Sequence, residues 1–302
     1  MSPAKKSDSS SSARNGHKSV WLLLLLAIVV GAAVVGGPYL AWRKLKPRIL
    51  SAPEYRVGPE QVEITPAPKW IHSDIRAEVF RDPSLAGPLS LMDDTLTEEI
   101  SKAFASHPWV AKVKQVTKRH PSSSSPVAVR VELVYRQPVC MVEQVPGEVL
   151  PVDGEGVVLP SEDFSPIEAT RYLRLVVGGN QKPDLSPGQR WADAKVVGGA
   201  EIAAALGAVW EAMRLKQIVP LAAPTSVGAA ASREPLFALF TQRGTRILWG
   251  YAPGANMLGE PPAAEKIARL QRYVAVHDTL DIPPGQPQEL DVRTLPAGPG
   301  KP

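Results

Sequence analysis

The stretch HPWVAKVKQVTKRHPSSSSPVAVRVELVYRQPV, residues 107–139, decides the fold of the first folded part of the chain. From residue 127 to residue 135 every second side chain is a large apolar one. A period of two is typical of a strand with one packed face and one wet face. Residues 109–118 form a second candidate strand, and the polar, proline-containing segment 119–126 predicts a turn between the two. The stretch therefore predicts a β-hairpin, and no reactive site is needed to explain it.

The residues before this hairpin predict one more strand and two helices. Residues 60–66 form a short strand candidate closed by proline. A helix is expected over 73–80 with Ser73 as N-cap, and another begins at a cap on Thr95 or Thr97 and stops at Pro108. The order strand, helix, helix, strand, strand predicts a two-layer module with both helices on one face of a small sheet. This first module is expected to span residues 55–143.

Beyond residue 143 the pattern changes to short strands separated by turns, which predicts a mixed, β-rich domain over residues 144–295. The whole chain is therefore expected to be α+β. The expected elements are a hairpin over 150–160 turning at Asp153-Gly154, a strand over 170–179, a helix over 198–215, an Ala-rich loop over 220–235, a hairpin over 236–250 turning at Arg243-Gly244, a helix over 263–277 and a last strand over 288–295.

Residues 19–42 carry no charge and predict a membrane-spanning helix. At 1.5 Å per helical residue they extend about 36 Å, which exceeds a hydrocarbon core of about 30 Å. Trp21 at one end and Tyr39 and Trp42 at the other suit the two membrane interfaces. A cleavable signal peptide is the alternative, because Gly31-Ala32-Ala33 resembles a cleavage region. Residues 1–18 are then a polar tail, and residues 43–54 a linker.

The orientation of this segment is less clearly encoded than the span. Four cations precede it and four follow it within a few residues, so the positive-inside count is a tie. A short Ser-rich tail before a large folded region favours a single-pass type II protein, with the N-terminus in the cytoplasm and the folded domains outside the plasma membrane. A loose tail is expected over residues 296–302.

The chain lacks the residue patterns of common catalytic and metal sites. Cys140 is the only cysteine, so no internal disulfide is possible, and its apolar neighbours indicate a buried side chain rather than a nucleophile. The five histidines show no metal-ligand spacing, and no phosphate-cradling loop, dinucleotide fingerprint or nucleophile elbow is present. With a net charge of only +4, nucleic acid is an unexpected partner. We therefore expect no enzyme activity, cofactor, metal or small-molecule substrate.

A basic patch is the one charged feature of the hairpin. It consists of Lys112, Lys114, Lys118, Arg119 and His120. A solvated strand face explains it most simply, and contact with anionic lipid or peptidoglycan is the alternative.

Several motifs, taken in order, resemble the FtsQ/DivIB family of bacterial cell-division proteins. A basic tail and one anchor helix precede a "POTRA" module, whose Pro-Trp-Val and closing Glu-Arg-x-Pro-Val-Ala patterns correspond to HPWV and VELVYRQPVC here. The family's VDxxGxVF hairpin corresponds to VDGEGVVL, residues 152–159. LRLVVGG, GTRILWG and LDVR correspond to its later strands, so the resemblance covers about residues 15–295.

The resemblance implies a non-enzymatic scaffold of the divisome, enriched at the division site of the cell inner membrane. It implies partners of the FtsB/FtsL type, which are bitopic coiled-coil proteins, and a role in licensing septum formation by the septal wall synthesis machinery. Partner binding is expected by strand addition at a sheet edge. The candidate edge residues are Leu290, Asp291, Val292, Arg293, Thr294 and Leu295.

Three departures from the family pattern bear on this expectation. Tyr135 replaces a frequent Glu, Cys140 replaces an Ala, and Thr294 stands where the family often has an aromatic residue before one more strand. The partner edge is therefore either shortened or moved to the strand that contains LDVR. Two other classes stay open: a POTRA-bearing envelope transport or assembly component, and an exported enzyme with an unrecognised site.

Overall fold

A computed structural model describes residues 55–85, 89–119, 128–179, 183–221, 234–283 and 289–294, together with ten positions between 30 and 45. The chain divides into two compact units, residues 1–58 with 87–96, and residues 59–86 with 97–302. Each expected tail, 1–18 and 296–302, lies outside the described residues, as does nearly all of the linker 43–54 and most of the Ala-rich loop.

The described part of the first unit is held by a short antiparallel contact. Val57 N–H donates to the Leu89 carbonyl at 3.0 Å, and Leu91 N–H donates to the Tyr55 carbonyl at 2.8 Å. Arg56 and Ser90 form the bridge between the two segments. The Asp93 carboxylate accepts hydrogen bonds from the Thr95 N–H and hydroxyl, immediately before α3 begins at Leu96. A carboxylate at this point satisfies donors at the start of a helix.

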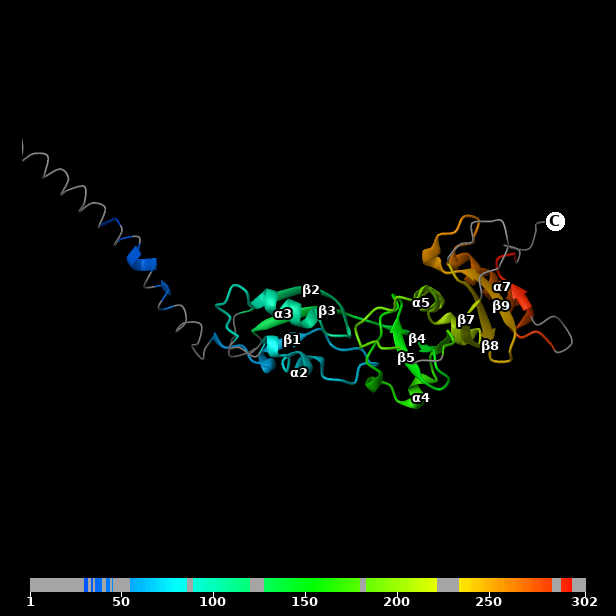
Figure 1. Cartoon of the computed structure of the whole chain (residues 1–302), viewed down its shortest axis with the longest axis horizontal. Coiled ribbons are helices and arrows are strands. Elements are labelled where there is room, and N and C mark those ends of the chain that lie inside the picture. The colour runs from blue at the N-terminus through cyan, green and yellow to red at the C-terminus, as the bar shows by residue number, and fades with distance from the viewer. Residues whose placement is uncertain are drawn as a thin grey trace, which may run out of the picture. The chain divides into compact units, whose positions relative to one another are not determined.

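The second unit contains the predicted three-stranded sheet, in the order β1-β3-β2 (Figure 1). The strands β2 and β3 form the expected antiparallel hairpin, and β1 pairs parallel to β3. Buried side chains from the strands and from both helices supply the apolar core, among them Ile75, Ile100 and Val131. The elements are β1 (Val62–Ile64), α2 (Ile75–Val79), α3 (Leu96–Ala105), β2 (Val110–Lys118) and β3 (Val129–Tyr135).

A seven-stranded mixed sheet follows, in the order β10-β9-β8-β7-β6-β4-β5. The first of these strands in the sequence, β4, lies within the range expected for the first module but pairs with β5 and β6. The strands are β4 (Pro138–Glu143), β5 (Val149–Asp153), β6 (Leu173–Val176), β7 (Leu215–Leu221), β8 (Leu236–Thr241), β9 (Arg246–Tyr251) and β10 (Glu289–Asp291). The helices are α4 (Pro166–Ala169), α5 (Ala194–Leu206), α6 (Val209–Ala212) and α7 (Ala263–His277). The described chain is thus α+β, as the sequence predicts.

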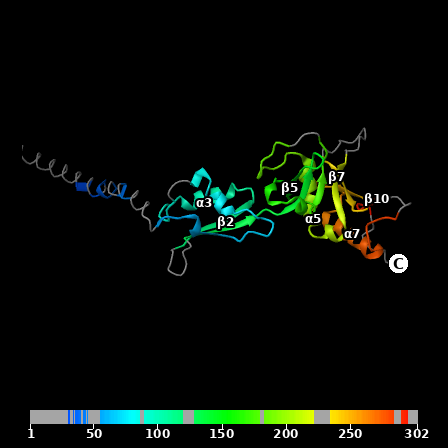
Figure 2. The same cartoon turned by 90° about the horizontal axis from the view of Figure 1, so that it is seen from below.

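Helices α5 and α7 contact each other and lie beside the seven-stranded sheet (Figure 2). Their buried residues join one core with the strands. Gly198 and Gly199 let α5 approach closely, because a Cβ atom at Gly199 would lie 2.4 Å from Leu175 Cδ1. The close approach of α5 therefore depends on these glycines.

One buried carboxylate, that of Asp163, connects distant segments of the second unit. It accepts from the Ser73 N–H at 2.9 Å, the Ser73 hydroxyl at 3.0 Å and the Trp109 indole N–H at 2.6 Å. The His72 N–H also donates to it, at 3.2 Å. The carboxylate is therefore well supplied with donors from both segments.

Arg136 and Asp153 come from two different motifs and form a partly buried ion pair. Arg136 Nη1 lies 2.6 Å from Asp153 Oδ2. The other oxygen of Asp153 accepts from the Glu155 N–H at 3.0 Å and the Val157 N–H at 2.9 Å. These bonds explain the sharp turn that the sequence predicts at Asp153-Gly154. The returning segment forms an isolated bridge between Val152 and Val158 in place of a full second strand.

Two expectations about helices were wrong. Asp74, not Ser73, is the N-cap of α2, because its side chain accepts from the Ala77 N–H while the Ser73 hydroxyl is bound to Asp163. The helix expected over 198–215 begins earlier, at Ala194, and ends at Leu206, because Gly207 adopts a positive φ of 49°. The short α6 follows, and the next residues form β7, a strand that the sequence pattern did not predict.

The predicted membrane-spanning segment lies mostly outside the described residues. Its described positions are helical, and Tyr39 and Trp42 are exposed, whereas Trp21 is not described. Within the described part of the chain, no helix combines the length and apolarity needed to cross a membrane.

Candidate functional site: the β10 edge of the seven-stranded sheet

The last strand, β10, lies at one end of the seven-stranded sheet. It pairs parallel to β9, with Glu289 opposite Arg246, Leu290 opposite Ile247 and Asp291 opposite Leu248. No described residue pairs with its outer side. An unpaired edge offers main-chain donors and acceptors to another strand.

The side chains of this strand alternate between core and surface. Leu290 and Val292 are buried in the core of the sheet. Asp291 and Arg293 are partly exposed, and Thr294 is exposed. At the start of the strand, Glu289 is exposed and its carboxylate pairs with Arg246 at 3.0 Å. The two buried side chains hold β10 in the sheet, and the others are available to solvent.

The main-chain groups of β10 alternate in the same way. Val292 N–H donates inward, to the Leu248 carbonyl of β9, at 3.2 Å. Because successive residues of a strand direct their main-chain groups to opposite sides, the groups of Asp291 and Glu289 point outward. These two residues carry the outward groups of the edge.

The opposite end of the same sheet is covered by the chain itself. Asp153 N–H of β5 donates to the Val157 carbonyl at 3.1 Å, and Leu159 N–H donates back to the Pro151 carbonyl at 2.9 Å. Beyond them, Val158 N–H donates to the Gln189 carbonyl at 2.9 Å. Of the two ends of this sheet, β10 is therefore the one to which no further described segment of the chain adds a ladder of main-chain bonds.

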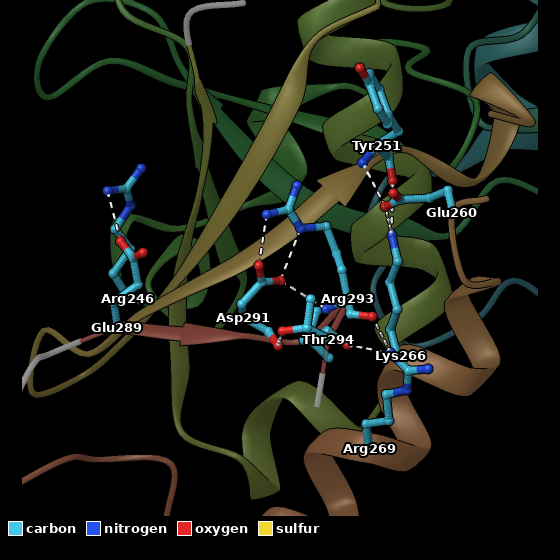
Figure 3. Close-up of polar contacts among 10 residues, drawn as sticks. Arg246, Tyr251, Glu260, Lys266, Arg269, Glu289, Asp291, Arg293 and Thr294 are labelled. Atoms are coloured by element: carbon cyan, nitrogen blue, oxygen red, sulfur yellow. Dashed lines mark hydrogen bonds and ion pairs between the residues drawn. The ribbon is translucent and has the colours of Figure 1, made fainter. Parts of the chain in front are cut away.

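The residues after β10 turn sharply and bond to one another (Figure 3). Arg293 Nε and Nη2 donate to the two oxygens of Asp291 at 2.9 and 2.7 Å. The Arg293 N–H also donates to Asp291 Oδ1, at 3.0 Å. The Thr294 N–H and hydroxyl both donate to the Asp291 carbonyl at 3.3 Å. The hydrogen bonds from Arg293 lower the pKa of Asp291.

Helix α7 supports this turn from the inner side. Arg269 Nη1 donates to the Val292 carbonyl at 2.9 Å and also to the Arg293 carbonyl. Its Nη2 is bound to Glu265 at 2.7 Å, one turn earlier on α7. A guanidinium with donors in a fixed fork can hold both carbonyls and the carboxylate at once.

A buried ion pair lies next to the Arg293 side chain (Figure 3). The Lys266 ammonium is bonded to Glu260 Oε1 and lies 4.9 Å from the centre of the Trp249 ring. Glu260 Oε1 also accepts from the Tyr251 N–H at 3.0 Å. Burial lowers the pKa of Lys266, and the bond to Glu260 acts in the opposite direction. The pair holds the segment between β9 and α7 onto the end of β9.

A pocket of about 390 Å³ opens beside this ion pair. Its lining includes Trp249, Met257, Leu258 and Pro261. Leu258 is fully exposed. The pocket is lined by apolar side chains and by the Lys266–Glu260 ion pair.

The structure places the predicted edge residues as follows. Leu290 and Val292 are core side chains, Asp291 and Arg293 pair with each other, Thr294 closes the turn, and Leu295 lies outside the described residues. The sequence patterns did not point to Arg269, Glu260 or Lys266. Only the spacing of Glu265 and Arg269, four residues apart on a helix, could have indicated one of these contacts.

Cys140 is buried, and burial raises the pKa of its thiol, which disfavours the nucleophilic thiolate. No group of three or more His, Cys, Asp or Glu side chains in the described ranges is arranged to hold a metal ion. Lys112 and Lys114 of the basic patch are exposed on β2, and His120 is not described.

The chain was compared with protein-family models and with curated proteins. No family model matches the chain, and no curated protein matches it. The choice of the β10 edge as the candidate functional site therefore depends on the geometry of the described residues.

Proposed function

We propose that this chain is a non-enzymatic, membrane-anchored scaffold of the bacterial division machinery, similar to FtsQ/DivIB proteins. Segment 19–42 anchors it in the plasma membrane with the N-terminus in the cytoplasm. The three-stranded module corresponds to the POTRA module of that family. The β10 edge binds FtsB/FtsL-type coiled-coil partners by strand addition and so connects the chain to septal wall synthesis.

One observation carries this proposal: β10 is the end strand of the seven-stranded sheet, and no described strand pairs with its outer side. The contrast with β5 supports it, because the chain covers that end with residues 157–159. Natural proteins commonly protect sheet edges, so an unprotected edge is a candidate for a partner strand. The FtsB/FtsL-type partner is proposed because the order of motifs along the sequence resembles that of the FtsQ/DivIB family.

A proline at Glu289 tests strand addition without removing the bonds to β9. The Glu289 N–H points outward, so Glu289→Pro removes one outer donor at the first residue of the strand, where proline is tolerated. Glu289→Ala loses the same carboxylate but keeps the N–H, and is the matched control. Val292→Pro is less suitable, because the Val292 N–H is donated to Leu248 and its loss would release β10 itself.

The measurement is an affinity pull-down of the full, membrane-anchored chain, with co-purified proteins identified by mass spectrometry. We expect small bitopic coiled-coil division proteins with the unchanged chain and with Glu289→Ala, and at least about tenfold less with Glu289→Pro, since a lost interfacial hydrogen bond and strand distortion cost roughly 1.4 kcal/mol or more. Equal recovery with both variants would rule out strand addition at this edge. Absence of such proteins from every sample would rule out the proposed function.

A further inference from the structure

The outward main-chain groups at the C-terminal half of the β10 edge are already bonded within the chain. The Asp291 carbonyl accepts from the Thr294 N–H and hydroxyl, and the Arg293 N–H donates to the Asp291 side chain. The Arg293 carbonyl accepts from Arg269. In the folded chain, an added strand therefore meets the groups of Glu289 and the Asp291 N–H, but not the Asp291 carbonyl or the main-chain groups of Arg293.

The Asp291 carboxylate takes the place that a partner's carbonyl would occupy. An added strand would offer a carbonyl oxygen to a main-chain N–H of the edge. The Arg293 N–H has a carboxylate oxygen 3.0 Å away, and the bidentate guanidinium contact holds that carboxylate in position. Charge-assisted, bidentate contacts of this kind are stronger than neutral hydrogen bonds.

The side of this turn that faces the sheet is fixed as well (Figure 3). Arg269 holds two successive carbonyls, at Val292 and Arg293. The Arg293 side chain packs against Gly250, since a Cβ atom at Gly250 would lie 2.9 Å from Arg293 Cδ. A larger residue at position 250 would also meet Glu260. The turn is thus positioned by β9, by α7 and by the segment between them.

We infer that Asp291, Arg293 and Thr294 form an internal clasp that occupies the Asp291 carbonyl and the Arg293 N–H at the C-terminal end of the β10 edge, and that a longer partner strand must displace this clasp. This inference rests on the proposed function, because the partner strand is the one that the β10 edge is proposed to bind. Only molecules in which the clasp is open can bind the full length of that strand. The apparent affinity is therefore the intrinsic affinity multiplied by the fraction of molecules with an open clasp. Asp291 and Arg293 are therefore residues that set the affinity and length of the strand interface, in addition to shaping the turn.

The first experiment tests the clasp without any partner. Amide hydrogen exchange is measured at Arg293 and Thr294 in the full chain in phospholipid nanodiscs. In Asp291→Ala we expect both amides to exchange at least about fivefold faster, because their acceptors are lost or displaced. Glu63→Ala is the matched control, because it removes a similar carboxylate–arginine pair, with Arg130 on the three-stranded sheet, and leaves the clasp intact. Unchanged exchange in Asp291→Ala would overturn the clasp.

The second experiment measures binding of the FtsB/FtsL-type coiled-coil pair encoded in the same genome, in the same nanodiscs. We expect Asp291→Ala to bind about fivefold more tightly than the unchanged chain, and Glu63→Ala to bind as the unchanged chain does. Arg293→Gln keeps the main-chain N–H and loses the guanidinium, so it serves where Asp291→Ala fails to fold, with the same direction expected. Equal or weaker binding by both clasp variants would overturn the inferred role of the clasp.

The two failures are distinguishable. If exchange accelerates in Asp291→Ala but no variant binds the coiled-coil pair, the clasp stands as a structural feature and both its gating role and the proposed function are wrong. If Glu289→Pro abolishes binding while Asp291→Ala changes neither exchange nor affinity, strand addition stands and the clasp is wrong.

Discussion

Single residues carry several of the long-range connections in this chain. Asp163 is the strongest case, because one buried carboxylate receives donors from His72, Ser73 and Trp109. Trp109 belongs to a motif that the sequence marks clearly, but the motif gives no sign that its indole N–H binds a residue 54 positions later. Such a contact depends on where two distant segments meet, and local patterns carry no information about that.

Loss of the Asp163 carboxylate should destabilise the second unit strongly. Asp163→Ala leaves the Trp109 indole N–H and the donors of Ser73 without their acceptor, and we expect the free energy of unfolding to fall by about 3 kcal/mol. Thermal unfolding followed by intrinsic tryptophan fluorescence would measure this. Asp184→Ala, at an exposed position, is the control and should change the unfolding midpoint little. Similar midpoints for the two variants would show that Asp163 has no such role.

At the scale of secondary-structure elements, the end of β9 is shaped by its last glycine. Gly250 has a φ of 93°, a value that favours glycine, and lies where the register of β8 and β9 shifts. A Cβ atom there would lie 2.0 Å from Glu260 Oε1. Gly244, in the turn of the same hairpin, has the same φ, but a Cβ atom added to it would meet no atom within 4 Å. Substitutions at these two glycines therefore distinguish the free-energy cost of backbone strain from the additional cost of a steric clash.

Alanine substitutions at these glycines should have different costs. Gly244→Ala should lower the free energy of unfolding by about 1–2 kcal/mol, which is the usual cost of a left-handed conformation. Gly250→Ala should lower the free energy of unfolding by about 1–3 kcal/mol more than Gly244→Ala does, because Glu260 must leave its bonds to Lys266 and Tyr251. Chemical denaturation of both variants measures the difference. Equal costs would mean that Glu260 moves aside freely.

The turn after β10 should show a measurable dependence on pH. Arg293 lowers the pKa of Asp291, so the folded-state pKa lies below the unfolded value near 3.8. The contribution of this pair is therefore complete above that value and is lost as the pH falls through the folded-state pKa. Carboxyl chemical shifts in an NMR titration would report it. In Arg293→Gln the pKa of Asp291 should rise toward its ordinary value, and an unchanged pKa would contradict the assigned cause.

At the scale of the whole molecule, the seven-stranded sheet is protected unequally at its two ends. β5 is covered by residues 157–159, whereas no described strand pairs with the outer side of β10. β8 lies between β7 and β9 and contains fully buried residues such as Ala238 and Leu239. We therefore expect the free energy of local opening to be highest at the central strand β8 and lowest at the edge strand β10.

Hydrogen exchange along the sheet should reproduce this order. Amides of β8 should exchange slowest, and the outward amides of Glu289 and Asp291 fastest, by at least about 100-fold, because main-chain groups at a sheet edge face solvent. Exchange by NMR or by mass spectrometry of the full chain measures it. Protection of Glu289 and Asp291 equal to that of β8 would mean that the outer side of β10 is covered.

The period-two and helical patterns predicted the main hairpins, α7 and the α+β class, because these depend on which face of a local segment is apolar. They failed at the end of the range 198–215 and beyond it, because Gly207 ends α5, the short α6 follows, and burial in the sheet selects the strand β7 from Leu215 onward. The position of β10 at the sheet edge, the Asp291–Arg293 pair held by Arg269 and the Asp163 contacts follow from the packing of segments far apart in the chain. Local residue patterns do not encode such contacts, because contact between distant segments depends on the shape of the whole core.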